Sequence, residues 1–232
     1  RAIMLPHAGW KYCGDIVART ISQTEVPDLA LVIGPKHSPY GARLAAASED
    51  FWLYPHAALP IAVKLAQILQ TRIPGLTRDS EAHRVEHSCE VLLPFLHYAN
   101  ASLRVLPIAV GNSSLSELLS FGEALGNAIS TLGIRVLYVI PSDLNHFADD
   151  DENQRRDRSA IEAMISGNPE VLYETCKSKD ISMCGMQPAV VVMKALLTQS
   201  ETIAPKLIEY HTSAPISFDY ARVVGYAGMV IE

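Results

Sequence analysis

The stretch Leu5-Pro6-His7-Ala8-Gly9-Trp10 places a histidine directly after the apolar segment Arg1–Leu5. That segment is typical of a buried strand, and Pro6 ends it because proline has no N–H to donate to a neighbouring strand. A helical pattern begins a few residues later, after Gly14. Ligands of open α/β folds bind at the carboxyl ends of strands. His7 is therefore a candidate site residue, provided that other strand ends supply partners.

The same arrangement occurs twice more along the chain. Residues 29–33 form a continuous apolar run, typical of a strand buried on both faces, and they lead into Gly34-Pro35-Lys36-His37. Residues 134–140 form the clearest core strand, which leads into Pro141-Ser142-Asp143-Leu144-Asn145-His146. Three strands are thus followed by a proline and then by ionisable residues. This repetition indicates a site, although spacing alone does not establish that these side chains meet.

The remaining pattern alternates strands with helices, which predicts an α/β fold. We expect a single domain over residues 1–232, built as a three-layer sandwich around a largely parallel or mixed sheet. The last two strands are expected to add an antiparallel edge. The expected helices span 13–24, 59–70, about 89–99 (capped by Ser88), 115–131, 159–166, 169–178 and 188–197. Further strands are expected at 42–54, as a hairpin, and at 103–110, 206–210 and 223–231, with Pro107 indicating an edge strand or a bulge.

Composition excludes several classes of protein. Of the 232 residues, 49% are apolar and 19% are charged, so the chain can form a large core. The net charge is −6 without a basic stripe, which argues against nucleic acid as a partner. No apolar run is long enough to span a bilayer. The four cysteines are widely spaced, which excludes a zinc ribbon and favours free thiols, so we expect a cytoplasmic protein.

The candidate site residues are of types that bind metals or transfer protons. Cys184 precedes a predicted helix, where the helix dipole favours a thiolate. Two imidazoles with a thiolate or a carboxylate make a three-ligand site with open positions, suited to zinc, iron or copper. A metal-free Cys–His pair would use the same residue types. The acidic run at 149–152 is expected to be an exposed helix start. The collected residues are His7, His37, Asp143, His146 and Cys184, with Glu86 and His87 of related type.

Five blocks of sequence resemble the signature of the Memo-like family, whose prokaryotic members are called AmmeMemoRadiSam system protein B. The blocks occur in the family's order and cover nearly the whole chain. Two departures lie beside the site, since Trp10 stands where tyrosine is usual and Leu144-Asn145 replaces an aromatic–small pair. The blocks are Pro6-His7-Ala8-Gly9, Gly34-Pro35-Lys36-His37, Glu86-His87-Ser88-Cys89-Glu90-Val91, Ser142-Asp143-Leu144-Asn145-His146 and Cys184-Gly185-Met186-Gln187-Pro188.

The resemblance implies a fold similar to the class III extradiol dioxygenases, which hold non-haem iron with two histidines and a glutamate. It implies His7, His37 and Cys184 as metal ligands, with cysteine in the third position. Asp143 and His146 match further site residues, with His146 similar to the acid–base histidine of the dioxygenases. The catalytic set expected from the resemblance is therefore His146, Asp143 and His87. Iron is the metal that the resemblance favours, with copper or zinc as alternatives.

Three functions remain open at this point. The first is a metal-dependent redox protein of unknown substrate, similar to the non-haem iron dioxygenases. The second is a non-catalytic binding module, whose cleft holds a peptide or small molecule, or which binds a radical-SAM protein and an AMME-type partner domain. The third is a metal-free Cys–His hydrolase that uses Cys184 as its nucleophile.

Overall fold

The computed structural model describes all residues from 1 to 232 and contains a mixed sheet of nine strands. The strand order is β10-β11-β1-β8-β2-β7-β3-β6, and β9 pairs with β11 beside this path. The strands are β1 (Ala2–Leu5), β2 (Leu29–Pro35), β3 (Leu44–Ala46), β6 (Leu76–Arg78), β7 (Arg104–Val110), β8 (Leu137–Pro141), β9 (His146–Ala148), β10 (Pro205–Thr212) and β11 (Val223–Ile231).

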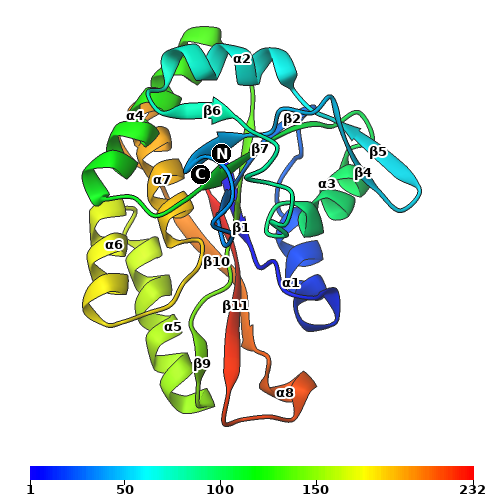
Figure 1. Cartoon of the computed structure of the whole chain (residues 1–232). Helices are drawn as coiled ribbons and strands as arrows, with labels where there is room; N and C mark the ends of the chain where they lie inside the picture. Colours follow the sequence, from blue (N-terminus) through cyan, green and yellow to red (C-terminus); the bar gives the residue numbers. More distant parts are fainter.

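Helices cover both faces of the sheet, which confirms the expected three-layer α/β architecture (Figure 1). One face carries α1 (Trp10–Ile21) and α3 (Leu93–Ala99), and α1 packs on β1, β10 and β11. The other face carries α4 (Leu115–Leu132), α5 (Asp150–Ile165), α6 (Pro169–Ser178) and α7 (Met186–Gln199). The remaining helices are α2 (Val63–Arg72), which packs near β6, and the short η1 (Glu90–Leu92) and α8 (Ala214–Ser217). No helix has the length and apolar character that crossing a membrane requires.

Three neighbouring parallel strands form the centre of the sheet. β8 lies between β1 and β2 and pairs with both in parallel, with Met4 opposite Ile140 and Val32 opposite Val139. All residues of these three strands are buried, as the continuous apolar runs predict. Because the strands are parallel, their carboxyl ends meet at one edge of the sheet. The polar residues that follow each strand are therefore brought together there.

Helix ends follow their local sequence signals. Ser114 caps α4 through a capping box with Glu117, and Gly133 ends the helix with φ of 60°. Asp149 caps α5, and acids fill its first turn, which confirms the expected exposed helix start at 149–152. β10 and β11 pair antiparallel at the edge of the sheet, as predicted.

The structure corrects four local expectations. The helix expected over 59–70 begins only at Val63, because Ala57–Pro60 form β5, which pairs with β4 (Phe51–Tyr54) in a separate hairpin. The hairpin expected within 42–54 does not form, because β3 instead joins the main sheet between β6 and β7. Pro107 does not mark an edge strand, because β7 is an interior strand between β2 and β3. The last register pair between β7 and β3 is Ile108 opposite Ala46, so Pro107 lies one residue beyond it. Ser88 does not cap the following helix, since neither η1 nor α3 has a side-chain cap, and the Ser88 hydroxyl donates a hydrogen bond to the carbonyl of Pro35 at 3.1 Å.

Candidate metal centre

His7, Asp143 and His37 each lie two residues beyond the end of one of the three central parallel strands. The backbone N–H of His7 donates to the carboxylate Oδ1 of Asp143 at 2.9 Å, which fastens the end of β1 to the end of β8. His7 and Asp143 are 3% and 6% exposed, whereas the side chain of His37 is partly open to solvent. The site is therefore closed on the side of the sheet and open on the other.

Three imidazoles converge at this edge. One nitrogen of each of His7, His37 and His87 lies within 4.8 Å of the other two, an arrangement that can hold a metal ion. The ring centroids are 5.2–5.5 Å apart, with His37 and His87 stacked. His87 comes from the loop before η1 and is the most exposed of the three. The sequence assigned His87 to the catalytic set, and in the structure it lies with His7 and His37.

Glu86 fixes the orientation of His37. Its carboxylate accepts hydrogen bonds from the backbone N–H of His37 at 2.5 Å, from His37 Nδ1 at 2.8 Å and from the N–H of Ser88 at 3.0 Å. Burial opposes ionisation of Glu86, but these bonds outweigh it and lower its pKa to about 2. The bond from Glu86 also raises the pKa of His37. Because Nδ1–H of His37 is engaged by Glu86, Nε2 is left as the nitrogen that can bind a metal.

His7 is prepared to act as a neutral ligand. Burial, together with the nearby imidazoles of His37 and His87, lowers its pKa to about 3, so the ring carries no charge near neutral pH. Its Nδ1 is buried without a hydrogen-bond partner, and Asp143 Oδ1 lies 3.9 Å away. Because Nδ1 faces Asp143, the opposite nitrogen Nε2, which lies 3.7 Å from Cys184 Sγ, is the one that can bind a metal ion.

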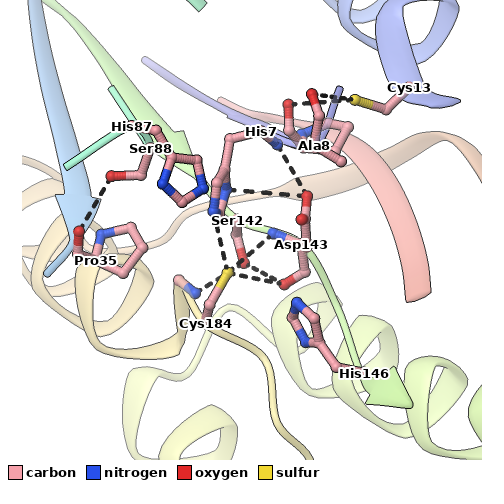
Figure 2. Close-up of polar contacts among 12 residues, drawn as sticks. His7, Ala8, Cys13, Pro35, His87, Ser88, Ser142, Asp143, His146 and Cys184 are labelled. Atoms are coloured by element: carbon pink, nitrogen blue, oxygen red, sulfur yellow. Dashed lines mark hydrogen bonds and ion pairs between the residues drawn. The ribbon is translucent and has the colours of Figure 1, made fainter. Parts of the chain in front are cut away.

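Cys184 lies against His7 in the loop before α7 (Figure 2). Its Sγ is 3.7 Å from His7 Nε2, accepts the backbone N–H of Asp143 at 3.2 Å, and is 3.7 Å from the Asp143 carbonyl. The 3.7 Å separation is close to the spacing of about 3.5 Å expected for sulfur and nitrogen bound to one ion with bonds of roughly 2.3 and 2.1 Å.

The sequence predicts a thiolate for Cys184 at this helix start, and this prediction is wrong for the protein without a bound metal. Burial and the nearby carboxylate of Asp143 raise the pKa of the Cys184 thiol, and these effects outweigh the opposing hydrogen bonds from the backbone N–H groups of Asp143 and Gly185. Burial also raises the pKa of Asp143. Both groups would be ionised more readily beside a cation, which is the environment that a bound metal supplies.

Ser182 anchors His146 at the side of the site. The Ser182 hydroxyl accepts the backbone N–H of His146 at 2.8 Å, and the Ser182 carbonyl lies 3.1 Å from His146 Nδ1. A carbonyl can only accept, so Nδ1 carries the proton and Nε2 keeps its lone pair. In the view of Figure 2, His87 and His146 lie on opposite sides of Cys184. His146 is therefore placed at the margin of the histidine cluster with a defined tautomer.

A buried polar network supports the loop that carries Asp143 and His146. Asn145, Asn153 and Asp157 are each fully buried. Asp157 accepts the N–H of Asn145 at 2.7 Å and the side-chain amide of Asn153 at 2.9 Å, and Asn145 Oδ1 accepts the N–H of Ser182 at 3.1 Å. One network thus ties the loop after β8 to the loop that carries Cys184.

Gly225 leaves room for this network. A Cβ at this position would lie 1.9 Å from Asp157 Oδ2, so any other residue would displace the buried carboxylate. Tyr210 on β10 donates its hydroxyl to the same oxygen at 2.8 Å. Burial raises the pKa of Asp157 to about 6, because the donors compensate only part of the cost of burying the charge.

The candidate residues from the sequence are thus found at this edge of the sheet, but the predicted ligand set differs from the observed cluster. Cys184 contacts His7 alone among the histidines, and His87 is the third residue whose ligand atom lies within 4.8 Å of those of His7 and His37. Sequence reasoning did not assign Glu86 its role in holding His37, and it missed the network of Asn145, Asn153 and Asp157. A signal for Asn153 and Asp157 was present, because both lie at helical spacing on the apolar stripe of α5 that includes Ala160 and Ile161.

Fold and site together define the class of protein: an α/β protein with a cluster of histidines, able to hold a metal, at the carboxyl edge of its central strands. The family model for "Memo-like protein" matches residues 1–230, and the chain belongs to this family. A MEMO1 family protein of Aquifex aeolicus is 33% identical over 231 residues, covering 99% of this chain and 85% of the relative. One of Archaeoglobus fulgidus is 31% identical, covering 100% and 86%.

A solved structure supports the fold. The crystal structure of the uncharacterized protein JW3007 from Escherichia coli K12 matches with a TM-score of 0.62, covering 99% of this chain and 98% of that one. The two sequences are 12% identical, so the likeness concerns the fold alone. The family resemblance inferred from the five sequence blocks is confirmed by the family model and by these relatives.

Proposed function

We propose that this chain is a redox-type protein that binds a metal ion through His7, His37 and Cys184, with His87 facing the same point. The observation that carries the proposal is the convergence of three imidazoles, in which one nitrogen each of His7, His37 and His87 lies within 4.8 Å of the other two. The contact between Cys184 Sγ and His7 Nε2 supports the thiol as a further ligand. Nitrogen and sulfur ligands suit iron, copper or zinc better than magnesium. We propose iron first, with copper or zinc as alternatives.

A bound iron or copper ion would supply one-electron chemistry at this edge of the sheet. The chain's own residues would prepare the site for it. Glu86 orients His37 and keeps its proton on Nδ1, while burial keeps His7 neutral. Asp143 holds the His7 backbone and receives no strong cationic partner from the chain. A cation bound between the three histidines would therefore stabilise the ionised form of this buried carboxylate.

His146 is the residue that we propose for proton transfer. Its Nδ1–H is held by the Ser182 carbonyl, so Nε2 has a free lone pair that can accept and return a proton. The ring is only partly buried, which leaves it accessible to a substrate entering from solvent. Together with Asp143 and His87, it forms the catalytic set expected from the family resemblance.

Metal analysis of anaerobically purified protein tests this proposal. We expect about one equivalent of transition metal in the wild type and a loss of at least tenfold in affinity in His7→Ala and in Cys184→Ser. His56→Ala, which removes an exposed histidine at the turn of the β4–β5 hairpin, is the matched control. Cobalt loading of wild type should give a thiolate-to-metal absorption that Cys184→Ser lacks. Full retention of metal in both site variants would refute the assignment.

The same preparations separate a redox protein from a binding module. Loaded protein that consumes oxygen or peroxide, with activity lost in His146→Ala while metal is retained, would support the redox function. Loaded protein that shows no consumption, but captures a radical-SAM or AMME-type partner, would favour the non-catalytic alternative.

A further inference from the structure

A second concave site lies beside the metal centre and shares none of its proposed residues. A cleft of about 660 Å³ is formed by the β4–β5 hairpin, the loop and helix start over 80–94, and Trp10 at the start of α1. This volume is typical of sites for small organic ligands. The hairpin projects from the main sheet near α3 (Figure 1), and its Tyr54 hydroxyl contacts His97 of α3.

Aromatic rings dominate the lining of the cleft. Trp10, Phe51, Trp52 and Tyr54 all line it, and Trp10 and Phe51 are 53% and 55% exposed. Leu53, at the edge of the same hairpin, is 81% exposed. Soluble proteins seldom leave so many large apolar side chains together in solvent unless the surface binds something. The cleft therefore offers several ring faces to a ligand.

Both indole N–H donors of the cleft are engaged within the protein, and its one guanidinium is ion-paired. Trp10 Nε1 donates to the Val91 carbonyl at 3.0 Å, and Trp52 Nε1 donates to Glu49 at 3.3 Å. Arg84, the only basic residue in the lining, donates to Glu81 at 2.9 Å. An anionic ligand would thus find no unpaired cation and no free indole donor.

Acceptors, by contrast, are left open. His83 is 7% exposed, and its Nε2 must donate to the Ala45 carbonyl at 3.1 Å, because a carbonyl only accepts. Its Nδ1 is therefore a bare acceptor, and this buried nitrogen has no partner in the structure. Glu90 also lines the cleft and has neither an ion pair nor a side-chain hydrogen bond. Three carboxylates, Glu49, Glu81 and Glu90, oppose one guanidinium, which leaves two net negative charges.

We propose that this cleft binds an organic cation, in which an ammonium or guanidinium group is attached to an aromatic or aliphatic body. The rings of Trp10 and Trp52 would contact the body of the ligand and attract its cation through their ring faces. Glu90 would pair with the charge. This site goes beyond the proposed metal function, because it uses none of the metal ligands.

Tryptophan fluorescence provides a direct test, because the chain contains two tryptophans and both line the cleft. Wild-type protein with excess chelator is titrated with 2-phenylethylamine, with the neutral analogue 2-phenylethanol and with the anion 3-phenylpropionate, and calorimetry is run in parallel. We expect saturable binding of the amine, at least about tenfold tighter than the alcohol, a difference of 1.4 kcal/mol, and no binding of the anion.

Glu90→Gln should weaken amine binding about tenfold and leave the alcohol unchanged, whereas Glu201→Gln, an exposed control outside the cleft, should bind as wild type does. A short lysine or arginine peptide forms a second arm: tighter binding of the peptide than of the free amine assigns the cation to a partner protein, and the reverse assigns it to a small molecule. Equal affinity for amine and alcohol, or no saturable signal or heat with any of these cations, would overturn the proposal. Because chelator is present throughout, the result is independent of the metal centre.

Discussion

Glu86→Gln is the substitution that tests most sharply how the site is built. The carboxylate of Glu86 is buried and accepts three hydrogen bonds, two from His37 and one from Ser88. Glutamine can keep Oε1 in place for His37 Nδ1 and Ser88. Its amide nitrogen would then replace Oε2 and face the backbone N–H of His37, which is also a donor.

The magnitude follows from that count of bonds. Hydrogen bonds to a charged group contribute about 1.5–3 kcal/mol each, and the substitution removes one and weakens two others. We expect the free energy of unfolding to fall by about 2–3 kcal/mol. Loss of the carboxylate that orients a ligating histidine typically weakens metal binding by about 10–100-fold, or roughly 1.4–2.7 kcal/mol.

Two assays measure these effects separately. Urea unfolding of metal-free protein gives the change in stability, and competition with a chromophoric chelator gives the metal affinity of the folded protein. Glu90→Gln is the matched control, because it removes an exposed carboxylate from the same segment and should alter neither quantity. A Glu86→Gln protein that is folded and binds metal within about threefold of wild type would refute His37 as a ligand oriented by Glu86.

Two further predictions concern the buried network behind the site. Burial raises the pKa of Asp157 from 3.8 to about 6, so the folded state binds its proton more tightly than the unfolded state; stability present below pH 3.8 is lost as the pH rises through 6, by about 3 kcal/mol. Asp157→Asn should remove this fall, which urea unfolding between pH 3.5 and 7 would measure. Tyr210 and Asp150 face Asp157 and stay unchanged in both proteins. The reasoning would be contradicted if the free energy of unfolding varied with pH equally in wild type and variant. Gly225→Ala should cost about 1–3 kcal/mol, because its Cβ meets the Asp157 carboxylate at 1.9 Å; an unchanged unfolding midpoint would contradict it.

Much of the fold could be predicted from the sequence because its central strands carry strong, simple signals. The continuous apolar runs before Pro35 and Pro141 are buried on both faces, and each ends where the proline indicates. Gly133 and Asp149 likewise mark helix boundaries through local backbone chemistry. Such signals act over a few residues, so a single sequence contains them in full.

The parts that could not be predicted depend on contacts between distant segments. The helix predicted over 59–70 starts too early, because apolar spacing alone does not reveal that Ala57–Pro60 pair with Phe51–Tyr54. Pro107 predicted an edge strand or a bulge, but β7 is an interior strand. Its neighbour β3 ends at Ala46, opposite Ile108, so the backbone nitrogen of Pro107, which has no N–H, lies beyond the paired residues of β3. In both cases, pairing with another segment outweighed the local pattern.

The candidate site shows the same division. The proline-terminated strands indicated His7, His37 and Asp143, and parallel pairing explains why they meet. The role of Glu86 could not be read from spacing, since it depends on a bond to a residue 49 positions away. The helix start also predicted a thiolate at Cys184, but burial and the carboxylate of Asp143, which comes from another strand end, raise the pKa of this thiol.

Anomalous diffraction from crystals of anaerobically metal-loaded protein tests the central proposal most directly. At the absorption edge of the bound metal, we expect one strong peak about 2.0–2.3 Å from a nitrogen of His7, Nε2 of His37 and Sγ of Cys184. A nitrogen of His87 at a similar distance would add it to the ligands. A peak away from these residues, or stoichiometric metal without a peak at this edge of the sheet, would contradict the account.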